Sequence, residues 1–442
     1  MAIELEGRLY EQRERGNDSP GNHNARNPQP GAQEGDGASM RSAKILARPD
    51  GMFCRGLFKS MGYSDDDLSR PLIGIANSWT NLVPGHLNLR QVAESVKEGI
   101  YRGGGTPVEF GVIAACDGIA NGHEGMRYIL PSRELICHSI EVMAQAHKLD
   151  ALVLLGSCDK IVPGMLMAAA RLDIPAIFVP GGPMLGGIEF DGRKTDLTSL
   201  DEARAMLSSG KISEDEFYAL EDLCGPSCGS CSFFGTANTM CCLAEALGMT
   251  LPGGALIPAV HPDRMRLAQA SGRAICEMTK CEVGARKILS QQFLENAVKV
   301  CLAIGGSTNA VLHLPAIACE AEVEVDIIEA FSRFNKTTPY IAKVNPASQW
   351  DMEDFWKAGG IPRVMAHMQP LLNAQALTCT MKTVAENIAV YRYRFPENPE
   401  VIRTLAQPFS ATGGLAVLRG NLAPDTAISK PGAIDPSIRR FT

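Results

Sequence analysis

The sequence predicts an α/β protein whose mostly parallel sheet carries helices on both faces. Apolar runs without polar alternation, typical of strands buried on both sides, occur at residues 72–76, 110–115, 151–155 and 176–179. Between them lie segments whose apolar residues recur at helical spacing, such as Leu89, Val92, Val96 and Ile100. Strands that alternate with helices pair in parallel, and the connecting helices then cover the sheet.

The other elements follow in chain order. The helices that we expect span residues 87–101, 131–147, 165–172, 236–247, 262–279, 293–304 and 309–320. A charged stretch at 195–222 predicts an outlying pair of helices. From Phe409 the composition changes to short alternating runs, at 416–418 and 427–429, which predict the start of a β-rich module.

These elements divide the chain into a tail, a large domain and a short final piece. Residues 1–40 are rich in Asn, Gly, Pro, Asp and Gln and have few apolar residues, so we expect a disordered tail. Residues 41–408 form the α/β domain that carries the candidate site. Residues 409–442 are too few for a complete β-rich domain, so we expect only the start of a truncated one.

Composition limits the classes of function. The chain has 442 residues and a net charge of −7 without a long Lys/Arg run, which argues against nucleic acid and favours a small-molecule partner. No window of about 18 uninterrupted apolar residues predicts a membrane helix, and the first residues lack the features of a signal peptide. With 14 cysteines and no secretory signal, we expect reduced thiols, metal ligands and a cytoplasmic protein.

Two loops that follow predicted strands carry adjacent Cys and Asp residues. Cys116 and Asp117 follow the second strand, and Cys158, Asp159 and Lys160 follow the third. Open α/β sheets bind ligands at the carboxyl ends of their strands. A thiolate prefers iron or zinc and a carboxylate prefers magnesium or manganese, so one soft and one hard metal site are expected side by side. The alternative is a core cysteine beside a surface Asp-Lys pair.

A third loop holds three cysteines. Cys224, Cys228 and Cys231 have the C-x3-C-x2-C spacing of radical enzymes that use S-adenosylmethionine, but they lie far from the first strand of a barrel. A structural zinc site needs four ligands, and only Cys228 and Cys231 have the paired spacing. Cys242 lies within an apolar helix, where we expect it only to pack. The glycine-rich turn at 305–309 precedes a helix and is a candidate anion cradle or a close-packing turn.

Short motifs follow one another from about residue 41 to the end of the chain. They occupy residues 70–78, 84–86, 116–120, 122–126, 130–136, 158–160, 163–167, 228–231, 236–240 and 305–309. In sequence and order they resemble the dihydroxy-acid dehydratase and sugar-acid (phosphogluconate) dehydratase family. The segments 84–86 and 130–133 look more like the branched-chain dihydroxy-acid branch, because the sugar-acid branch usually carries Pro-Cys-Asn at the first place.

The resemblance implies an iron-sulfur cluster, of the 2Fe-2S or 4Fe-4S type, beside a magnesium ion. By motif, Cys158 and Cys231 match cluster ligands of the family. The family's third cysteine falls at the position of Gly85, so a third ligand in this chain is Cys116, Cys228 or absent.

The resemblance also assigns the hard site and the turn. Asp117 and Asp159 match magnesium ligands, and Lys160 matches the lysine that binds as a carbamate, which supplies the lone pair that an ammonium lacks. For substrate binding we expect the polar residues of the glycine-rich turn, Ser307, Thr308 and Asn309.

The implied reaction is dehydration of a 2,3-dihydroxy acid to a 2-keto acid, as in isoleucine and valine biosynthesis. Magnesium would hold the carboxylate and the 2-hydroxyl, and an open iron would bind the 3-hydroxyl as a Lewis acid. The alternatives are a sugar-acid dehydratase or a truncated, non-catalytic homologue. Because related enzymes are dimers, we expect a homodimer.

Some positions depart from the family pattern. The further magnesium-binding glutamate and the serine base of the family's carboxyl-terminal domain have no counterpart in this chain, so we expect negligible activity from the 442 residues alone. Phe233 and Phe234 replace a usual Gly-Met pair and are expected to narrow the space around the cluster.

Overall fold

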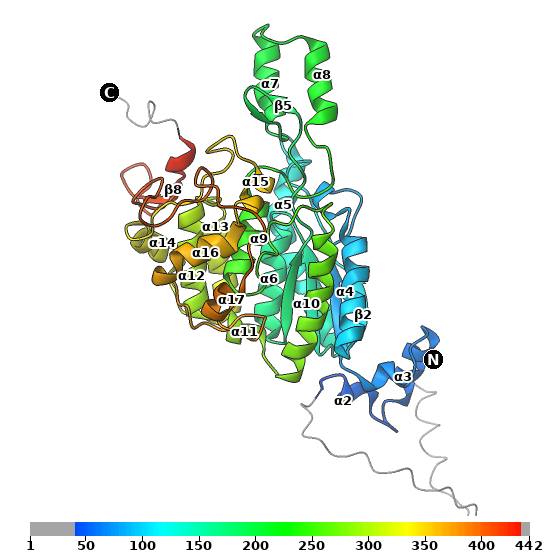
Figure 1. Cartoon of the computed structure of the whole chain (residues 1–442). Coiled ribbons are helices and arrows are strands. Elements are labelled where there is room, and N and C mark those ends of the chain that lie inside the picture. The colour runs from blue at the N-terminus through cyan, green and yellow to red at the C-terminus, as the bar shows by residue number, and fades with distance from the viewer. Residues whose placement is uncertain (1–39, 435–442) are drawn as a thin grey trace, which may run out of the picture. The chain divides into compact units, whose positions relative to one another are not determined.

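The computed structural model describes residues 40–434, and its centre is a sheet of four parallel strands in the order β2-β1-β3-β4 (Figure 1). The strands are β1 (Leu72–Asn77), β2 (Thr106–Gly111), β3 (Ala151–Gly156) and β4 (Ala176–Pro180). Every residue of β1, β3 and β4 is buried, which confirms the prediction made from their unbroken apolar runs. The tail predicted for residues 1–40 lies outside the described residues, apart from Met40.

The path of the chain through the sheet marks a ligand crevice. Ile73 of β1 pairs with Pro107 of β2 on one side and with Ala151 of β3 on the other. The chain therefore steps from β1 to β2 in one direction and then crosses back over β1 to reach β3. Open α/β sheets bind their ligands outside the carboxyl ends of the strands at such a reversal. The loops after β1 and β3 meet at this point.

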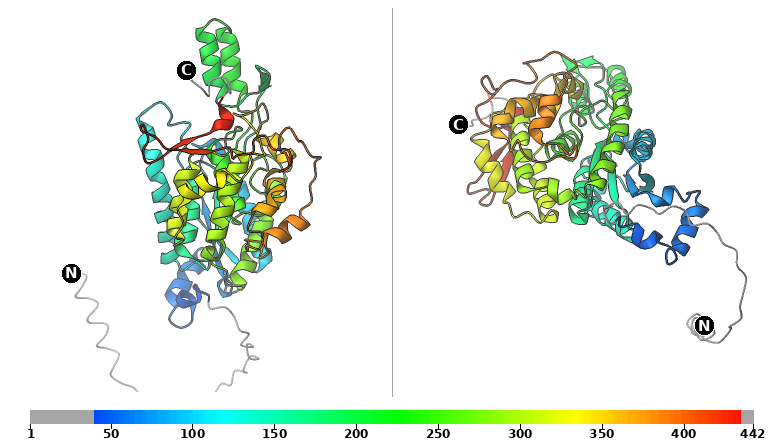
Figure 2. Two further views of the ribbon diagram at one scale, coloured as in Figure 1. Left: turned by 90° about the vertical axis from the view of Figure 1, so that its left-hand side faces the viewer. Right: turned by 60° about the horizontal axis from the view of Figure 1, so that its bottom comes forward.

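Helices cover both faces of the sheet, as predicted (Figures 1 and 2). The pair α4 (Leu89–Gly103) and α10 (Asp263–Lys280) lies on one face, and the pair α5 (Ile129–Ala146) and α6 (Ile161–Leu172) lies on the other. A Cβ atom on Gly99 would collide with the backbone of α10, and one on Gly272 with the backbone of α4. These two glycines therefore let α4 and α10 pack with their backbones in contact.

The helix that follows β3 starts earlier than predicted. We expected a start at Met165, but α6 begins at Ile161 and contains Pro163 in its first turn. Proline is tolerated there because the first backbone N–H groups of a helix have no acceptor within the helix. Lys160 consequently sits directly at the amino end of α6.

The second strand was predicted at the wrong place. It covers Thr106–Gly111 rather than 110–115, and it starts two residues after Gly104, which caps α4 with a φ of 87°. The observed strand contains Pro107, which is tolerated because β2 is an edge strand. After Pro107 the residues of β2 alternate between half-buried and exposed, because only one face of this strand packs against the core. The loop with Cys116 and Asp117 follows it after a short extended stretch.

The remaining elements surround this core. The other helices are α2 (Ala43–Leu46), α3 (Met52–Ser60), α7 (Ser199–Ser208), α8 (Glu214–Leu223), α9 (Thr236–Ala246), α11 (Ala285–Ile288), α12 (Gln291–Ile304), α13 (Ala310–Glu320), α14 (Ile327–Asn335), α15 (Met352–Lys357), α16 (Gly360–Met368) and α17 (Val384–Val390). The predicted outlying pair is α7 and α8, which projects from the sheet in both figures and is joined to it through the short hairpin β5 (Glu189–Phe190) and β6 (Arg193–Lys194).

Two short strands follow near the carboxyl end of the described range. β7 (Ala416–Leu418) and β8 (Ala427–Ser429) pair antiparallel, as their alternating runs predicted. Asn335 of α14 accepts from Gly413 through its backbone and donates to Gly413 through its side chain, which ties this piece to the helices. The domain boundary at residue 409 stays a prediction. None of the helices between residues 40 and 434 has the length and apolar character to cross a membrane.

Candidate active site

The loop after β1 positions the backbone of Cys158 through a buried histidine. His86 donates from Nδ1 to the carbonyl oxygen of Ser78 at 2.8 Å, which leaves Nε2 as an acceptor. The backbone N–H of Cys158 donates to this Nε2 at 3.3 Å. Burial lowers the pKa of His86 to about 4, so the ring stays neutral and keeps this role at neutral pH.

Gly85 lies against the sulfur of Cys158. A Cβ atom at Gly85 would come within 2.7 Å of Cys158 Sγ and 3.3 Å of the backbone nitrogen of Ser230. The neighbouring Gly229 donates its N–H to the carbonyl oxygen of Pro84 at 3.0 Å, so the two loops pack together. The position at which the resemblance expects a third cysteine is therefore beside Cys158 in space.

Three thiols from three loops gather at the carboxyl ends of the strands. Burial raises the pKa of Cys158 well above its ordinary value, and Cys116 and Cys231 raise it further. Burial also raises the pKa of Cys231 to about 12, with a further contribution from Cys116. No such neighbour acts on Cys228, whose pKa is raised by burial alone. Of the two cysteines considered as a third ligand, Cys116 joins the group and Cys228 does not.

Hydrogen bonds from α9 and from the end of β4 hold the loop of Cys231. Asn238 of α9 donates its side-chain amide to the carbonyl oxygens of Cys231 and Phe233, at 2.6 and 2.8 Å. The backbone of Ser230 accepts from Met184 at 2.7 Å and donates to Gly182 at 3.0 Å. The loop thus continues the sheet beyond β4 and is held by hydrogen bonds within the protein.

Two carboxylates face each other next to the thiols. The side chains of Asp117 and Asp159 lie within hydrogen-bond reach, and Lys160 Nζ is 3.6 Å from Asp159 Oδ2. Burial raises the pKa of Asp159 to about 7, and the charge of Asp117 adds to this rise, while Lys160 and a hydrogen bond from Thr236 oppose it. A single lysine does not balance two carboxylates, so the pair favours a proton or a further cation.

The glycine-rich turn reaches this carboxylate pair through Thr236. Thr236 Oγ1 lies 2.8 Å from Ser307 Oγ and accepts from the side-chain amide of Asn309 at 2.8 Å. Because the hydroxyl hydrogen of Thr236 is directed to Asp159, Ser307 is the donor of their bond. Ser307 and Asn309 therefore belong to the candidate site, whereas Thr308 is exposed and has no part in this network.

Sequence reasoning missed His313, which lies close enough to Lys160 to be affected by its charge, and the partner of His313, Arg133. His313 of α13 is fully buried, and its Nδ1 is 3.2 Å from Nη1 of Arg133 on α5. Burial lowers the pKa of His313 to about 3, and the charge of Lys160 contributes more to this than that of Arg133. The sequence did offer a signal for His313. It lies one helical turn after the glycine-rich turn, so it is expected on the same side of α13 as the start of that helix.

The residues present fit a divalent cation and a thiolate-bound cluster in their donor chemistry. Within residues 40–434, no three His, Cys, Asp or Glu side chains already stand in the close arrangement of a metal-ligand shell. The paired carboxylates of Asp117 and Asp159 are nevertheless hard donors in need of positive charge, and Cys158 and Cys231 are soft donors in loops that protein hydrogen bonds hold.

Of the two phenylalanines after Cys231, Phe234 belongs to the core and Phe233 is half-buried. Phe234 packs edge-to-face on Phe355 with ring centroids 6.0 Å apart, and Lys430 lies over its ring. Phe233 folds back over Gly235. The narrowing of the cluster space expected from this pair stays a prediction.

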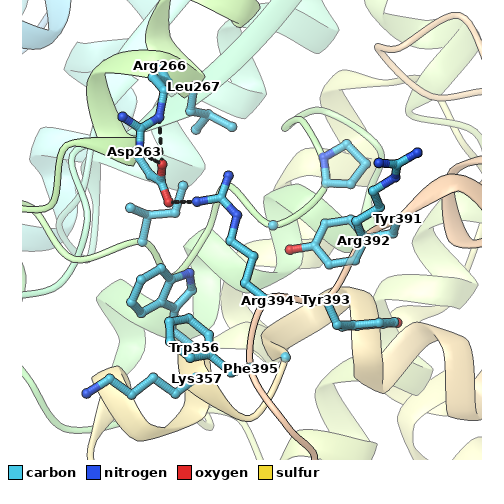
Figure 3. Close-up of a pocket in the computed structure, with 14 residues that line it drawn as sticks. Asp263, Arg266, Leu267, Trp356, Lys357, Tyr391, Arg392, Tyr393, Arg394 and Phe395 are labelled. Carbon is cyan, nitrogen blue, oxygen red and sulfur yellow. Dashed lines mark hydrogen bonds and ion pairs between the residues drawn. The ribbon is translucent and has the colours of Figure 1, made fainter.

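A separate pocket of about 270 Å³ lies among α10, α15 and residues 391–395 (Figure 3). Its lining alternates aromatic and basic side chains, but Arg266 and Arg394 both pair with Asp263. None of the predicted site residues lines it. Tyr and Arg alternate from Tyr391 to Arg394, but no site was predicted there from the sequence.

Comparison with known proteins adds to this geometry. The family described as dihydroxy-acid/6-phosphogluconate dehydratase matches in two parts, its N-terminal domain over residues 70–387 and its C-terminal domain over residues 400–442. The dihydroxy-acid dehydratase of Caldanaerobacter subterraneus subsp. tengcongensis is 49% identical over 403 residues, which are 91% of this chain and 72% of the relative. That of Methanothermobacter thermautotrophicus is 50% identical over 380 residues, 86% of this chain and 68% of the relative.

Proposed function

The chain belongs to the dihydroxy-acid/6-phosphogluconate dehydratase family, and on this basis we propose which residues bind its cofactors and substrate. It is a hydro-lyase that removes water from a dihydroxy acid. We propose that the acid is a 2,3-dihydroxy acid of branched-chain amino-acid biosynthesis and that the product is the 2-keto acid. The similar relatives named above, both called dihydroxy-acid dehydratases, support this choice over a sugar acid.

The gathering of soft and hard donors at the reversal between β1 and β3 is the observation that carries this proposal. Cys158 and Cys231 would hold an iron-sulfur cluster, and the position of Cys116 beside both supports it as the third ligand. Asp117, Asp159 and a carbamate on Lys160 would hold Mg²⁺.

The chemistry is divided between the bound groups and the chain. When bound, the cluster and the cation supply Lewis acidity for the departing hydroxide and for the negative charge that develops at C2. Thr236 donates to Asp159 and keeps that carboxylate oriented. Ser307 and Asn309 fix Thr236 from the other side and present polar groups to the substrate carboxylate. We assign the base that removes the C2 proton to none of residues 40–434.

A pair of buried cysteines gives a matched test of the cluster assignment. We expect Cys158→Ser to lose bound iron and acid-labile sulfide, measured on chain purified without oxygen, because an alcohol is a poor ligand for iron in a cluster. Cys242→Ser is the control, since Cys242 is equally buried but lies in the interior of α9. Equal iron in the two variants would show that Cys158 is not a ligand.

The homodimer expected from the resemblance also belongs to this proposal. Sedimentation equilibrium of the purified chain tests it, and a single species of the monomer mass over the accessible concentrations would contradict it.

A further inference from the structure

His313 is held from one side only. Arg133 Nη1 lies 3.2 Å from its Nδ1, and no other hydrogen bond to the ring is made by residues 40–434. The ring is fully buried on α13, which packs against α6, the helix that begins immediately after Lys160.

The partner on Nδ1 fixes where the ring proton resides. A guanidinium group has five N–H donors and no acceptor, so Arg133 can only donate and Nδ1 must be the unprotonated nitrogen. The ring proton of His313 is then on Nε2. This Nε2 is a buried atom without an acceptor among the described residues. A buried N–H group left without a partner destabilises the fold, so such a donor calls for an acceptor.

Lys160 does not supply that acceptor in its ordinary state. An ammonium carries three donors and no lone pair, so it cannot accept from Nε2 of His313. A carbamate on the same nitrogen carries two oxygens that accept. Resting on the proposed function of Lys160, we propose that His313 is a positioning residue that donates from Nε2 to the carbamate of Lys160.

Formation of the carbamate needs only CO₂ as a co-reactant. The ammonium of Lys160 first loses a proton, and the amine lone pair then attacks the carbon of CO₂. An N–C bond forms, one C=O electron pair moves to oxygen, and a second proton leaves nitrogen. The balance is one ammonium and one CO₂ giving one carbamate anion and two protons, without oxidation or reduction.

The carbamate adds a third negative group beside Asp117 and Asp159, which explains why it needs support. A divalent cation offsets part of this charge, and a donor from His313 stabilises the carbamate oxygen and sets its direction. Groups that orient metal ligands in this way typically change metal affinity about 10–100-fold when they are removed. His313 acts through Lys160 and need not touch the substrate.

The test measures the carbamate itself. The purified chain is incubated with ¹³C-bicarbonate and Mg²⁺, and the carbamate is detected by ¹³C NMR and by the loss of its signal on acidification. We expect a signal in the wild type, which is absent from Lys160→Met. Mg²⁺ affinity is measured on the same samples by calorimetry, so that neither readout depends on dehydratase activity.

Three substitutions at one position separate the hydrogen bond from packing. Glutamine carries an amide donor that reaches the place of Nε2, whereas the shorter asparagine and the apolar leucine do not. We expect His313→Gln to keep most of the carbamate signal, and His313→Asn and His313→Leu to lose most of it and to bind Mg²⁺ about tenfold more weakly. If the leucine variant does not fold, the two amide variants still form a matched pair.

The outcomes separate this inference from the function on which it rests. A wild-type carbamate signal that His313→Asn retains in full overturns the role of His313 and leaves the site assignment intact. The absence of a carbamate signal in the wild type would overturn both the role of His313 and the assignment of Lys160 as a carbamate. A carbamate signal that is present in His313→Gln and lost in His313→Asn supports both the role of His313 and the carbamate on Lys160.

Discussion

Strand β3 is flanked by two aspartates, the buried Asp150 and the half-buried Asp159, and the two differ in what surrounds them. Asp150 precedes the strand and accepts backbone N–H bonds from Ser42 at 3.0 Å and from Leu72 at 2.7 Å, one on each oxygen. Asp159 follows the strand and faces a second carboxylate, with one lysine nearby. The same residue type is thus a structural clamp at one end and an unfinished binding site at the other.

This difference distinguishes a carboxylate that stabilises the fold from one that is available to bind a ligand. A buried charge with a full set of backbone donors has no need of a ligand, whereas facing carboxylates leave charge unbalanced. The contrast also has a topological cause, because the carboxyl ends of parallel strands at a chain reversal are open to ligands and the amino ends are closed by connections.

The largest expected effect tests the clamp. Asp150→Ala leaves the buried N–H groups of Ser42 and Leu72 without acceptors, so we expect the free energy of unfolding to fall by about 3 kcal/mol. Urea denaturation measures it, with Asp222→Ala on the exposed side of α8 as the control. The structural role of Asp150 is contradicted if Asp150→Ala is as stable as the control, or if the folded variant loses Mg²⁺ binding.

The buried carboxylate of Glu245 does not fit the contrast between Asp150 and Asp159. Glu245 accepts from the backbone N–H groups of Gly253 and Ala255, at 2.6 and 2.9 Å, as Asp150 does. Yet burial raises its pKa from 4.5 to about 7, against the opposing effects of these N–H groups and of Arg264. The folded state then holds more protons than the unfolded state between these values, so this contribution to stability is complete below pH 4.5 and is lost as the pH rises through 7.

The corresponding measurement compares Glu245→Gln with the wild type. We expect the decrease in unfolding free energy between about pH 5 and about pH 8 to be smaller in the variant by on the order of 2 kcal/mol. Glu277→Gln, on the exposed side of α10, provides the control. Parallel pH profiles for Glu245→Gln and the wild type would show that two N–H donors keep a buried carboxylate ionised, which would sharpen the contrast with Asp159.

The smallest expected effect is at the unfinished site. Without divalent cation, we expect Asp159→Asn to raise the free energy of unfolding by about 1 kcal/mol, because it removes a like charge next to Asp117. The wild type should be stabilised by added Mg²⁺ and the variant should not. Thermal unfolding with and without Mg²⁺ measures both, and a variant that is destabilised or still responds to Mg²⁺ contradicts the assignment.

Much of the fold was predictable because buried strands have unbroken apolar runs. β1, β3 and β4 and the helices on both faces follow from this local signal. β2 was misplaced because Pro107 is unfavourable in an interior strand, and only the sheet order reveals that β2 is at the edge. The start of α6 was misplaced because proline in a first turn breaks no hydrogen bond.

The part of the candidate site that lies at the ends of the strands was predictable from the sequence. Cys158, Asp159 and Asp117 follow parallel strands, so their meeting requires only the topology. His313 and Arg133 were missed because they meet through the packing of α13 and α5, which no local pattern specifies. The proposed choice of Cys116 over Cys228 likewise rests on which thiol affects the pKa of Cys158 in the fold, which spacing in the chain does not reveal.

The spread of the site along the chain has a consequence during protein synthesis. A nascent chain that has left the ribosome as far as α8 contains Cys116 and Cys158 but not Cys231, and it lacks α9 and α13, which support Thr236 and His313. The central sheet can form before these helices emerge, because all four strands precede α7. The proposed cluster site can therefore assemble only after most of the chain has been translated, and until then Cys116 and Cys158 lack their partner Cys231.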